Sequence, residues 1–83
     1  MTAEDFNTDG DFDAAYKRYH QTVLSWMHDV VQDVEIASDL TEEVFITAFK
    51  KHRQFDPSKG TLKMWLYGIA RNVLRVFESR SKQ

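Results

Sequence analysis

Residues 55–72 organise this chain and read Phe55-Asp56-Pro57-Ser58-Lys59-Gly60-Thr61-Leu62-Lys63-Met64-Trp65-Leu66-Tyr67-Gly68-Ile69-Ala70-Arg71-Asn72. Pro57 and Gly60 predict a structured loop, and Thr61 is suited to cap the helix that follows. Apolar residues recur through that helix at steps of three and four. Those expected to point inward are Leu62, Trp65, Leu66, Ile69, Ala70, Val73, Val76 and Phe77.

Two further helices are predicted upstream of this loop. The first begins at Asp11 and places Phe12, Tyr16, Tyr19, Val23, Trp26 or Met27, and Val30 on one face. Asp33 is the expected N-cap of the second helix, which ends near Arg53 and has its apolar centre at Ala37, Leu40, Val44 and Ala48, with Phe45 and Phe49 at one margin. The sequence thus predicts an all-α fold, a compact bundle of three long helices.

At 83 residues the chain is long enough for one small domain. We expect an acidic, flexible tail at 1–10, the domain at 11–80 and the start of a linker at 81–83. No apolar run approaches the roughly 18 residues that cross a bilayer, and there is no cysteine. A cytoplasmic domain without membrane insertion is expected.

Charge is divided sharply along the chain. Residues 1–45 hold 11 acidic and 2 basic side chains, whereas residues 46–83 hold 9 basic and 2 acidic ones, so the halves carry −9 and +7. This polarity suggests one partner for the acidic half and another for the basic half. An ordinary dipolar surface is the alternative.

The second helix is expected to turn Asp39, Glu42, Glu43 and Ile46 outward. Ile46 is apolar but lies within a charged stripe, as at the centre of a docking patch with a polar rim. A single exposed apolar side chain without function is the alternative.

The third helix is expected to turn a different set outward: Lys63, Met64, Tyr67, Gly68, Arg71, Asn72 and Arg75. Cationic side chains neutralise phosphates, Asn can hydrogen-bond a base edge, and Tyr can stack on a base. Gly68 could admit a close backbone from a partner, or could serve tight packing against a neighbouring helix. The loop adds Phe55, Asp56, Ser58, Lys59, Gly60 and Thr61, which could form a pocket for one unstacked base; alternatively, Phe55 plugs the core.

These segments together resemble region 2 of bacterial RNA polymerase sigma factors, most closely the extracytoplasmic-function (ECF) group. The resemblance rests on Asp39-Leu40-Thr41-Glu42-Glu43-Val44-Phe45, on the loop at 55–60, and on Trp65-Leu66-Tyr67-Gly68-Ile69-Ala70-Arg71-Asn72, and it spans about residues 12–80. It implies that the acidic stripe docks on the clamp helices of the polymerase β′ subunit. Many members have Gln where this chain has Glu42.

For the basic half, the resemblance implies recognition and melting of the minus-ten promoter element. The loop would capture a flipped base of the non-template strand, and the helix would face the upstream duplex edge. Trp65 falls near the position where primary sigma factors use aromatic residues to wedge the duplex open. In this chain, however, the helical periodicity places Trp65 at the buried edge of the helix, so we expect it to pack against the core. Family members continue into a helix-turn-helix domain, so an excised domain is expected rather than a short natural protein.

Two other classes of function compete with this interpretation. A helical interaction module whose main partner is an anti-sigma factor would use the same two faces. An enzyme is not expected, because His20, His28 and His52 lack metal-ligand spacing and the carboxylates are not paired with a nucleophile. No metal or other cofactor is expected.

Overall fold

The computed structural model describes residues 9–81, and they form helices without any strand in that range. The long helices are α1 (Asp9–Val31), α2 (Val34–Lys50) and α3 (Leu62–Ser81), and two short 3-10 turns cover His52–Gln54 and Pro57–Lys59. The predicted all-α fold is confirmed. Residues 1–8 of the predicted tail and residues 82–83 of the predicted linker lie outside the described residues. No helix in the described range has the length and apolarity needed to cross a membrane.

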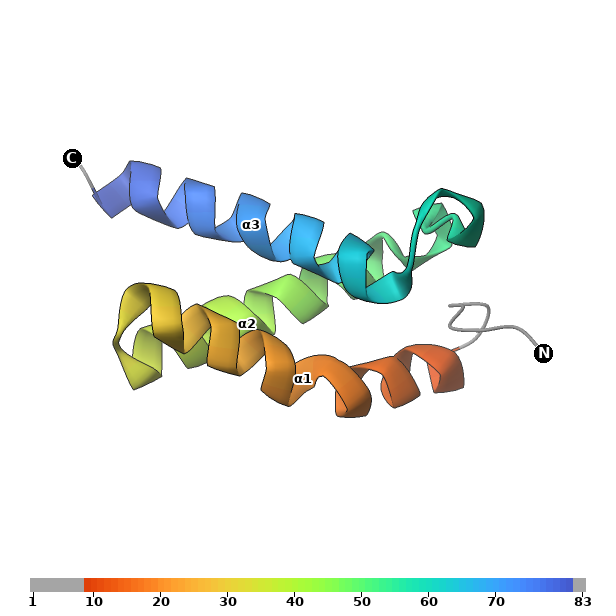
Figure 1. The fold of residues 1–83 in the computed structure, drawn as a ribbon, viewed down its shortest axis with the longest axis horizontal. Coiled ribbons are helices and arrows are strands. Elements are labelled where there is room, and N and C mark those ends of the chain that lie inside the picture. Colours follow the sequence, from red (N-terminus) through yellow and green to blue (C-terminus); the bar gives the residue numbers. More distant parts are fainter. Residues whose placement is uncertain (1–8, 82–83) are drawn as a thin grey trace.

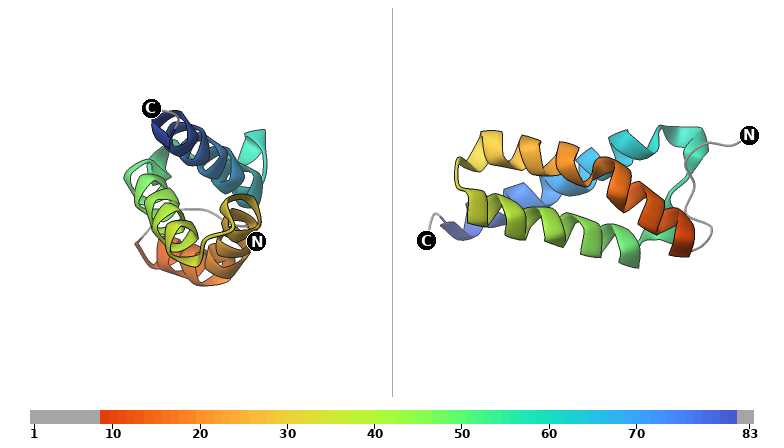
Figure 2. Two further views of the ribbon diagram at one scale, coloured as in Figure 1. Left: turned by 90° about the vertical axis from the view of Figure 1, so that its left-hand side faces the viewer. Right: turned by 90° about the horizontal axis from the view of Figure 1, so that it is seen from below.

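The three helices lie side by side in one elongated bundle (Figure 1). α1 and α2 run antiparallel as a hairpin, and α3 packs along α2 on its other side (Figure 2). The loop with the two 3-10 turns lies at the end of the bundle where α1 begins.

The turn between α1 and α2 is short because only Gln32 and Asp33 connect them. Gln32 has a φ of 57°, in the left-handed region, and Asp33 is extended. Asp33 accepts a hydrogen bond from the Ile36 amide at 3.0 Å, which confirms the predicted N-cap. At its other end α2 stops at Lys50 instead of near Arg53, because the chain tightens into a 3-10 turn at His52.

The start of α3 is fixed by two residues of the loop. The Thr61 hydroxyl accepts a hydrogen bond from the Met64 amide at 3.1 Å, so the predicted cap is confirmed. Gly60 has a φ of 157°, which side chains rarely tolerate, and this conformation turns the chain from the second 3-10 turn into the helix.

The core runs along α2 and is filled from both neighbouring helices. Its completely or almost completely buried members are Val23 and Met27 of α1, Ala37, Thr41, Val44, Phe45 and Ala48 of α2, and Leu62, Leu66 and Ala70 of α3. Thr41 is the buried polar residue, and its hydroxyl donates to the carbonyl of Ala37 at 2.7 Å. The hydroxyl is therefore satisfied inside its own helix.

Three predictions about individual side chains were wrong, and one buried residue was missed. Phe45 is buried rather than marginal, and Leu74, which was not predicted to face inward, is buried as well. Val30 and Val76 were expected inward, but each is 42% exposed. Both lie toward the ends of their helices, and Val76 borders the groove described below, so no third helix covers them.

Candidate functional site

The loop before α3 borders an open cavity of about 320 Å³. Its walls come from the loop and from the first turn of α3: Gln54, Phe55, Asp56, Lys59, Gly60, Thr61, Met64 and Trp65. Five of the six loop residues selected from the sequence are therefore brought together. The cavity combines aromatic rings, a carboxylate, a hydroxyl and a lysine, so it can both stack against a planar group and hydrogen-bond its edge.

The sixth loop residue, Ser58, supports the loop instead of lining the cavity. The Asp56 carboxylate accepts hydrogen bonds from the Ser58 hydroxyl at 2.7 Å and from the Ser58 amide at 2.9 Å. The hydroxyl contact, followed by the amide contact, lowers the pKa of Asp56 below its usual value. The carboxylate thus keeps its charge and shapes one edge of the cavity.

Phe55 serves both of the roles considered for it. It is half-buried, and its ring lies 5.4 Å from the ring of Trp65 at an angle of 53°. It therefore packs against α3 and at the same time forms a wall of the cavity. Trp65 is half-buried too, in agreement with its predicted place at the edge of the core.

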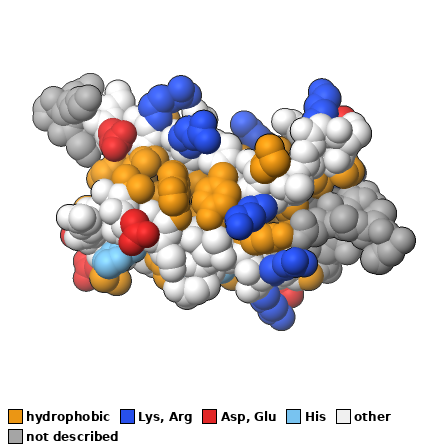
Figure 3. Space-filling model, in the orientation of Figure 1, with side chains coloured by type: hydrophobic (Ala, Val, Ile, Leu, Met, Phe, Trp, Pro, Cys, Tyr) orange, Lys and Arg blue, Asp and Glu red, His pale blue; other side chains and the backbone are white. Residues whose placement is uncertain are grey.

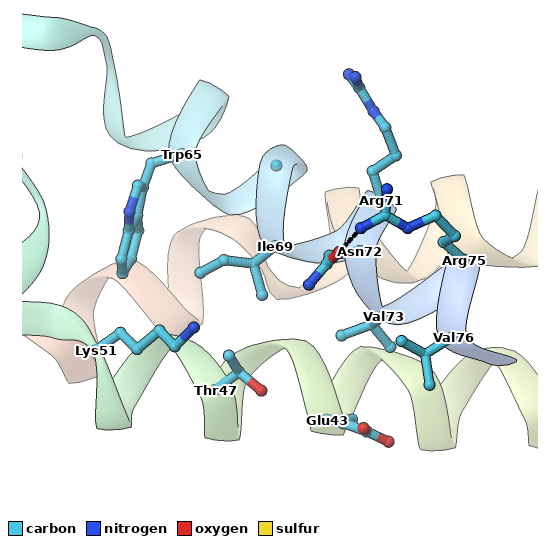
Figure 4. Close-up of a pocket in the computed structure, with 11 residues that line it drawn as sticks. Glu43, Thr47, Lys51, Trp65, Ile69, Arg71, Asn72, Val73, Arg75 and Val76 are labelled. Atoms are coloured by element: carbon cyan, nitrogen blue, oxygen red, sulfur yellow. Dashed lines mark hydrogen bonds between the residues drawn. The ribbon is translucent and has the colours of Figure 1, made fainter.

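A groove of about 620 Å³ separates α2 from α3 (Figure 4). Three residues of the predicted nucleic-acid set border it: Arg71, Asn72 and Arg75. Arg75 donates a hydrogen bond to the Asn72 side chain, whereas the Arg71 side chain extends away from the groove. The opposite wall consists of Glu43 and Thr47 of α2 and of Lys51, which directly follows this helix.

Lys63 and Tyr67 belong to another side of α3. Tyr67 packs edge-on against Trp26 of α1 at 5.7 Å, and the Lys63 ammonium lies 6.0 Å from the Tyr67 ring centre. Figure 3 shows the face on which α3 runs above α1, with a band of hydrophobic side chains bordered by Lys and Arg toward the loop end. The predicted nucleic-acid residues therefore divide between the loop cavity, the α2–α3 groove and the side that faces α1.

The four residues selected on α2 remain on its exposed side. Asp39, Glu42 and Glu43 are exposed, and Ile46 is 54% exposed among them. An apolar side chain surrounded by carboxylates is thus present on the surface, as a docking patch with a polar rim requires.

Glu42 differs from the other carboxylates of this stripe because α1 holds it. Its Oε2 accepts a hydrogen bond from the Tyr16 hydroxyl at 2.9 Å and lies 3.2 Å from Nε2 of His20. The hydrogen bond to Glu42, then burial, then the negative charge of Glu42 raise the pKa of Tyr16 above its usual value. Glu42 therefore contributes to the α1–α2 contact as well as to the exposed stripe.

Sequence reasoning missed Lys51 and Thr47, which line the groove. Both follow Glu43 at steps of four, so they continue the same side of α2 toward the loop. This spacing was a usable signal, but the residues selected for a site on this helix ended at Ile46. Met64 was expected on the outer side of the third helix but was not selected as a site residue, and it lines the loop cavity.

No group of three His, Asp or Glu side chains within the described residues could hold a metal ion. His20 pairs with Glu42, and Nδ1 of His52 contacts the carbonyl of Phe49 at 2.6 Å.

Comparison with known proteins bears on these surfaces. The family model for sigma-70 region 2 matches residues 15–81. The chain is similar to the ECF RNA polymerase sigma factor SigX of Bacillus subtilis (strain 168), with 32% identity over 62 residues that cover 75% of this chain and 31% of SigX. It is also similar to the ECF RNA polymerase sigma factor SigM of the same organism, with 30% identity over 71 residues that cover 86% of this chain and 42% of SigM. The chain thus spans about a third to two fifths of the length of these relatives. No solved structure matches it.

Proposed function

Because this chain belongs to the sigma-70 region 2 family, in its extracytoplasmic-function group, we propose that it is the domain of a sigma factor that docks on RNA polymerase and opens the promoter. The α2 stripe of Asp39, Glu42, Glu43 and Ile46 binds the clamp helices of the β′ subunit. The loop cavity and the outward residues of α3 bind the non-template strand of the minus-ten element. These α3 residues are Lys63, Tyr67, Arg71, Asn72 and Arg75. Sigma factors are not enzymes, and the domain acts by binding alone.

The loop cavity is the observation that carries the nucleic-acid half of this proposal. Residues selected from the sequence as a base pocket do border an open cavity of about 320 Å³. Phe55 and Trp65 supply rings on which a base can stack, while Asp56 and Thr61 supply groups for its polar edge. Lys59 adds a positive charge suited to the adjoining phosphate.

Opening of the promoter follows from the preference of this cavity for an unpaired base. A protein that binds one state of an equilibrium better shifts the equilibrium toward that state. Stacking of a captured base contributes roughly 1–3 kcal/mol, which offsets part of the cost of unpairing. The separated strand is therefore held open for the polymerase that α2 anchors.

The anchoring half is supported by the exposure of Ile46 among carboxylates. Carboxylates fit a cationic partner surface, and the apolar side chain supplies a contact that excludes water. The docking stripe and the loop cavity lie on different parts of the molecule, so both partners can be bound together.

Two charge reversals test the division of labour. Asp39→Lys is expected to abolish co-purification with bacterial RNA polymerase core while leaving oligonucleotide binding intact. Arg71→Glu is expected to retain the polymerase and to weaken DNA binding at least tenfold, about 1.4 kcal/mol. Binding is measured by fluorescence anisotropy with single-stranded oligonucleotides, after selection of the preferred sequence from a library with randomised positions.

The outcome separates the two candidate functions. Enrichment of one short sequence supports base capture, whereas equal recovery of all sequences at every salt concentration rejects it. If both reversals remove only a protein partner, such as an anti-sigma factor, the chain is an interaction module and the DNA assignment is wrong.

A further inference from the structure

Gly68 occupies a place in α3 where the fold does not require glycine. A Cβ atom built on it meets no other atom within 4 Å, so close packing against a neighbouring helix is not its purpose. Its backbone is helical, and among the described glycines a positive φ occurs at Gly60. Since glycine destabilises a helix interior relative to alanine, Gly68 weakens the domain without any compensating contact within it.

The surroundings of Gly68 indicate what the open position could serve. Gly68 lines the α2–α3 groove, with Lys51 directly after the facing helix and Arg75 two turns further along α3. Trp65 lines both this groove and the loop cavity, so the two hollows lie next to each other and share one wall residue. A strand with one base in the loop cavity would have a direct path past Gly68.

The structure points to a phosphate-binding path in the loop-side half of the groove: we infer that the sugar–phosphate backbone of the melted strand runs there. Gly68 is the point of closest approach, and Lys51 is a phosphate-binding residue. This inference rests on the proposed function and deepens it, since it assigns a role to two groove residues that the proposed function does not use.

The distribution of charge in the groove favours a nucleic-acid strand and limits where it can lie. Lys51 and Trp65 lie at the loop end, whereas Glu43 lies beneath Val73 and Val76 at the other end (Figure 4). Phosphates are attracted by Lys51 and repelled by Glu43. The strand therefore enters at the loop end and leaves over the outer side of α3, where Arg71 extends away from the groove.

Replacement of Gly68 gives a test in which stability and binding move in opposite directions. Gly68→Ala raises the Tm by about 4–8 °C, as expected for a domain of this size that gains helix propensity. The same variant binds a fluorescein-labelled oligothymidylate of about 12 nucleotides roughly fivefold to tenfold more weakly at low salt, because the methyl group occupies the path of the strand. Ser79→Ala, an exposed change in the last turns of the same helix, is the control and leaves binding unchanged.

Lys51 is tested through the salt dependence of binding. Each phosphate contact on a single strand contributes about 0.7 to the slope of log K against log salt concentration. Lys51→Gln is therefore expected to weaken binding severalfold and to reduce this slope by about 0.7. Lys17→Gln removes the same charge from α1, where Lys17 pairs with Asp13 at 3.3 Å, and leaves the slope unchanged.

The result that overturns the inference is a Gly68→Ala protein with raised Tm and unaltered affinity, or a Lys51→Gln protein with an unaltered slope. If these variants bind normally while Arg71→Glu does not, the proposed function stands and only the path past Gly68 is wrong. If the unmodified chain fails to bind the oligonucleotide at about 20 mM salt, both are wrong.

Discussion

The two sides of α2 are built differently. On the side of α1, the rings of Tyr16 and Phe45 lie 4.9 Å apart and those of Phe12 and Phe49 lie 5.1 Å apart, and Tyr16 reaches across to Glu42. On the side of α3, a groove of about 620 Å³ remains between the helices. One contact of α2 is therefore closed by aromatic packing, while the other leaves room for a partner.

This difference shows how a domain of 83 residues can combine stability with recognition. Small domains bury a limited share of their surface, so they cannot leave every helix contact partly open. Here the α1–α2 hairpin concentrates the aromatic packing, and α3 retains solvent-facing cationic and polar groups along the groove. We expect mutations on the two sides of α2 to have effects of very different size.

The largest effect is expected for Phe45→Ala in the closed contact. Phe45 is 2% exposed, and removing a buried phenylalanine costs about 3–5 kcal/mol of unfolding free energy. For a domain with a total stability of roughly 4–12 kcal/mol, this change leaves little folded protein at elevated temperature. Urea unfolding followed by circular dichroism provides the measurement.

Val76→Ala is the matched change on the open side. Val76 is 42% exposed beside the groove, so its truncation should cost about 1 kcal/mol or less. A loss as large as that of Phe45→Ala would mean that the groove is closed in solution, and the contrast between the two contacts would disappear.

A smaller effect is expected from the hydrogen bond that Tyr16 donates to Glu42. Its removal in Tyr16→Phe should cost about 0.5–1 kcal/mol at neutral pH. The pKa of Tyr16 is raised in the folded state above the ordinary value of 10.0. The hydrogen bond therefore contributes fully to the free energy of unfolding below pH 10. This contribution is lost as the pH rises through the folded pKa of Tyr16, because the tyrosinate would then face the Glu42 carboxylate.

The pH dependence distinguishes this effect from simple loss of packing. The stability difference between the unmodified chain and Tyr16→Phe should be constant from neutral pH to about pH 10 and should shrink above it. The other tyrosines are common to both proteins and cancel in the comparison. Parallel stability curves across the alkaline range would show that the Tyr16 hydroxyl does not titrate against Glu42.

The three helices and the N-terminal caps of α2 and α3 could be predicted from the sequence because their determinants are local. Asp33 and Thr61 cap helices with their own side chains, three residues from the amide they bind. The period of the apolar residues identified the buried side of each helix. The loop cavity was also predictable, since its wall residues lie within about one turn of the Pro57 to Gly60 segment.

The division of the outer face of α3 could not be predicted in this way. Helical periodicity places Tyr67 and Asn72 on the outer side, but it does not show which neighbouring helix each approaches. Tyr67 contacts Trp26 of α1, whereas Asn72 borders the groove beside α2. The neighbour of each residue depends on how the three helices pack, which local periodicity does not show. Glu42 gives the same lesson, since its partner Tyr16 lies 26 residues away in the chain.

The two-residue turn at Gln32 and Asp33 also bears on how the molecule assembles. Closing a short connection costs less chain entropy than closing the longer one at residues 51–61 that precedes α3. We therefore expect the hairpin of α1 and α2 to form first during refolding and α3 to join it later. Pulsed amide hydrogen exchange would contradict this order if the amides of α3 gained protection before those of the hairpin. In the expected order, α3, the helix that we propose to bind DNA, joins the hairpin last and is the helix whose local opening costs least free energy.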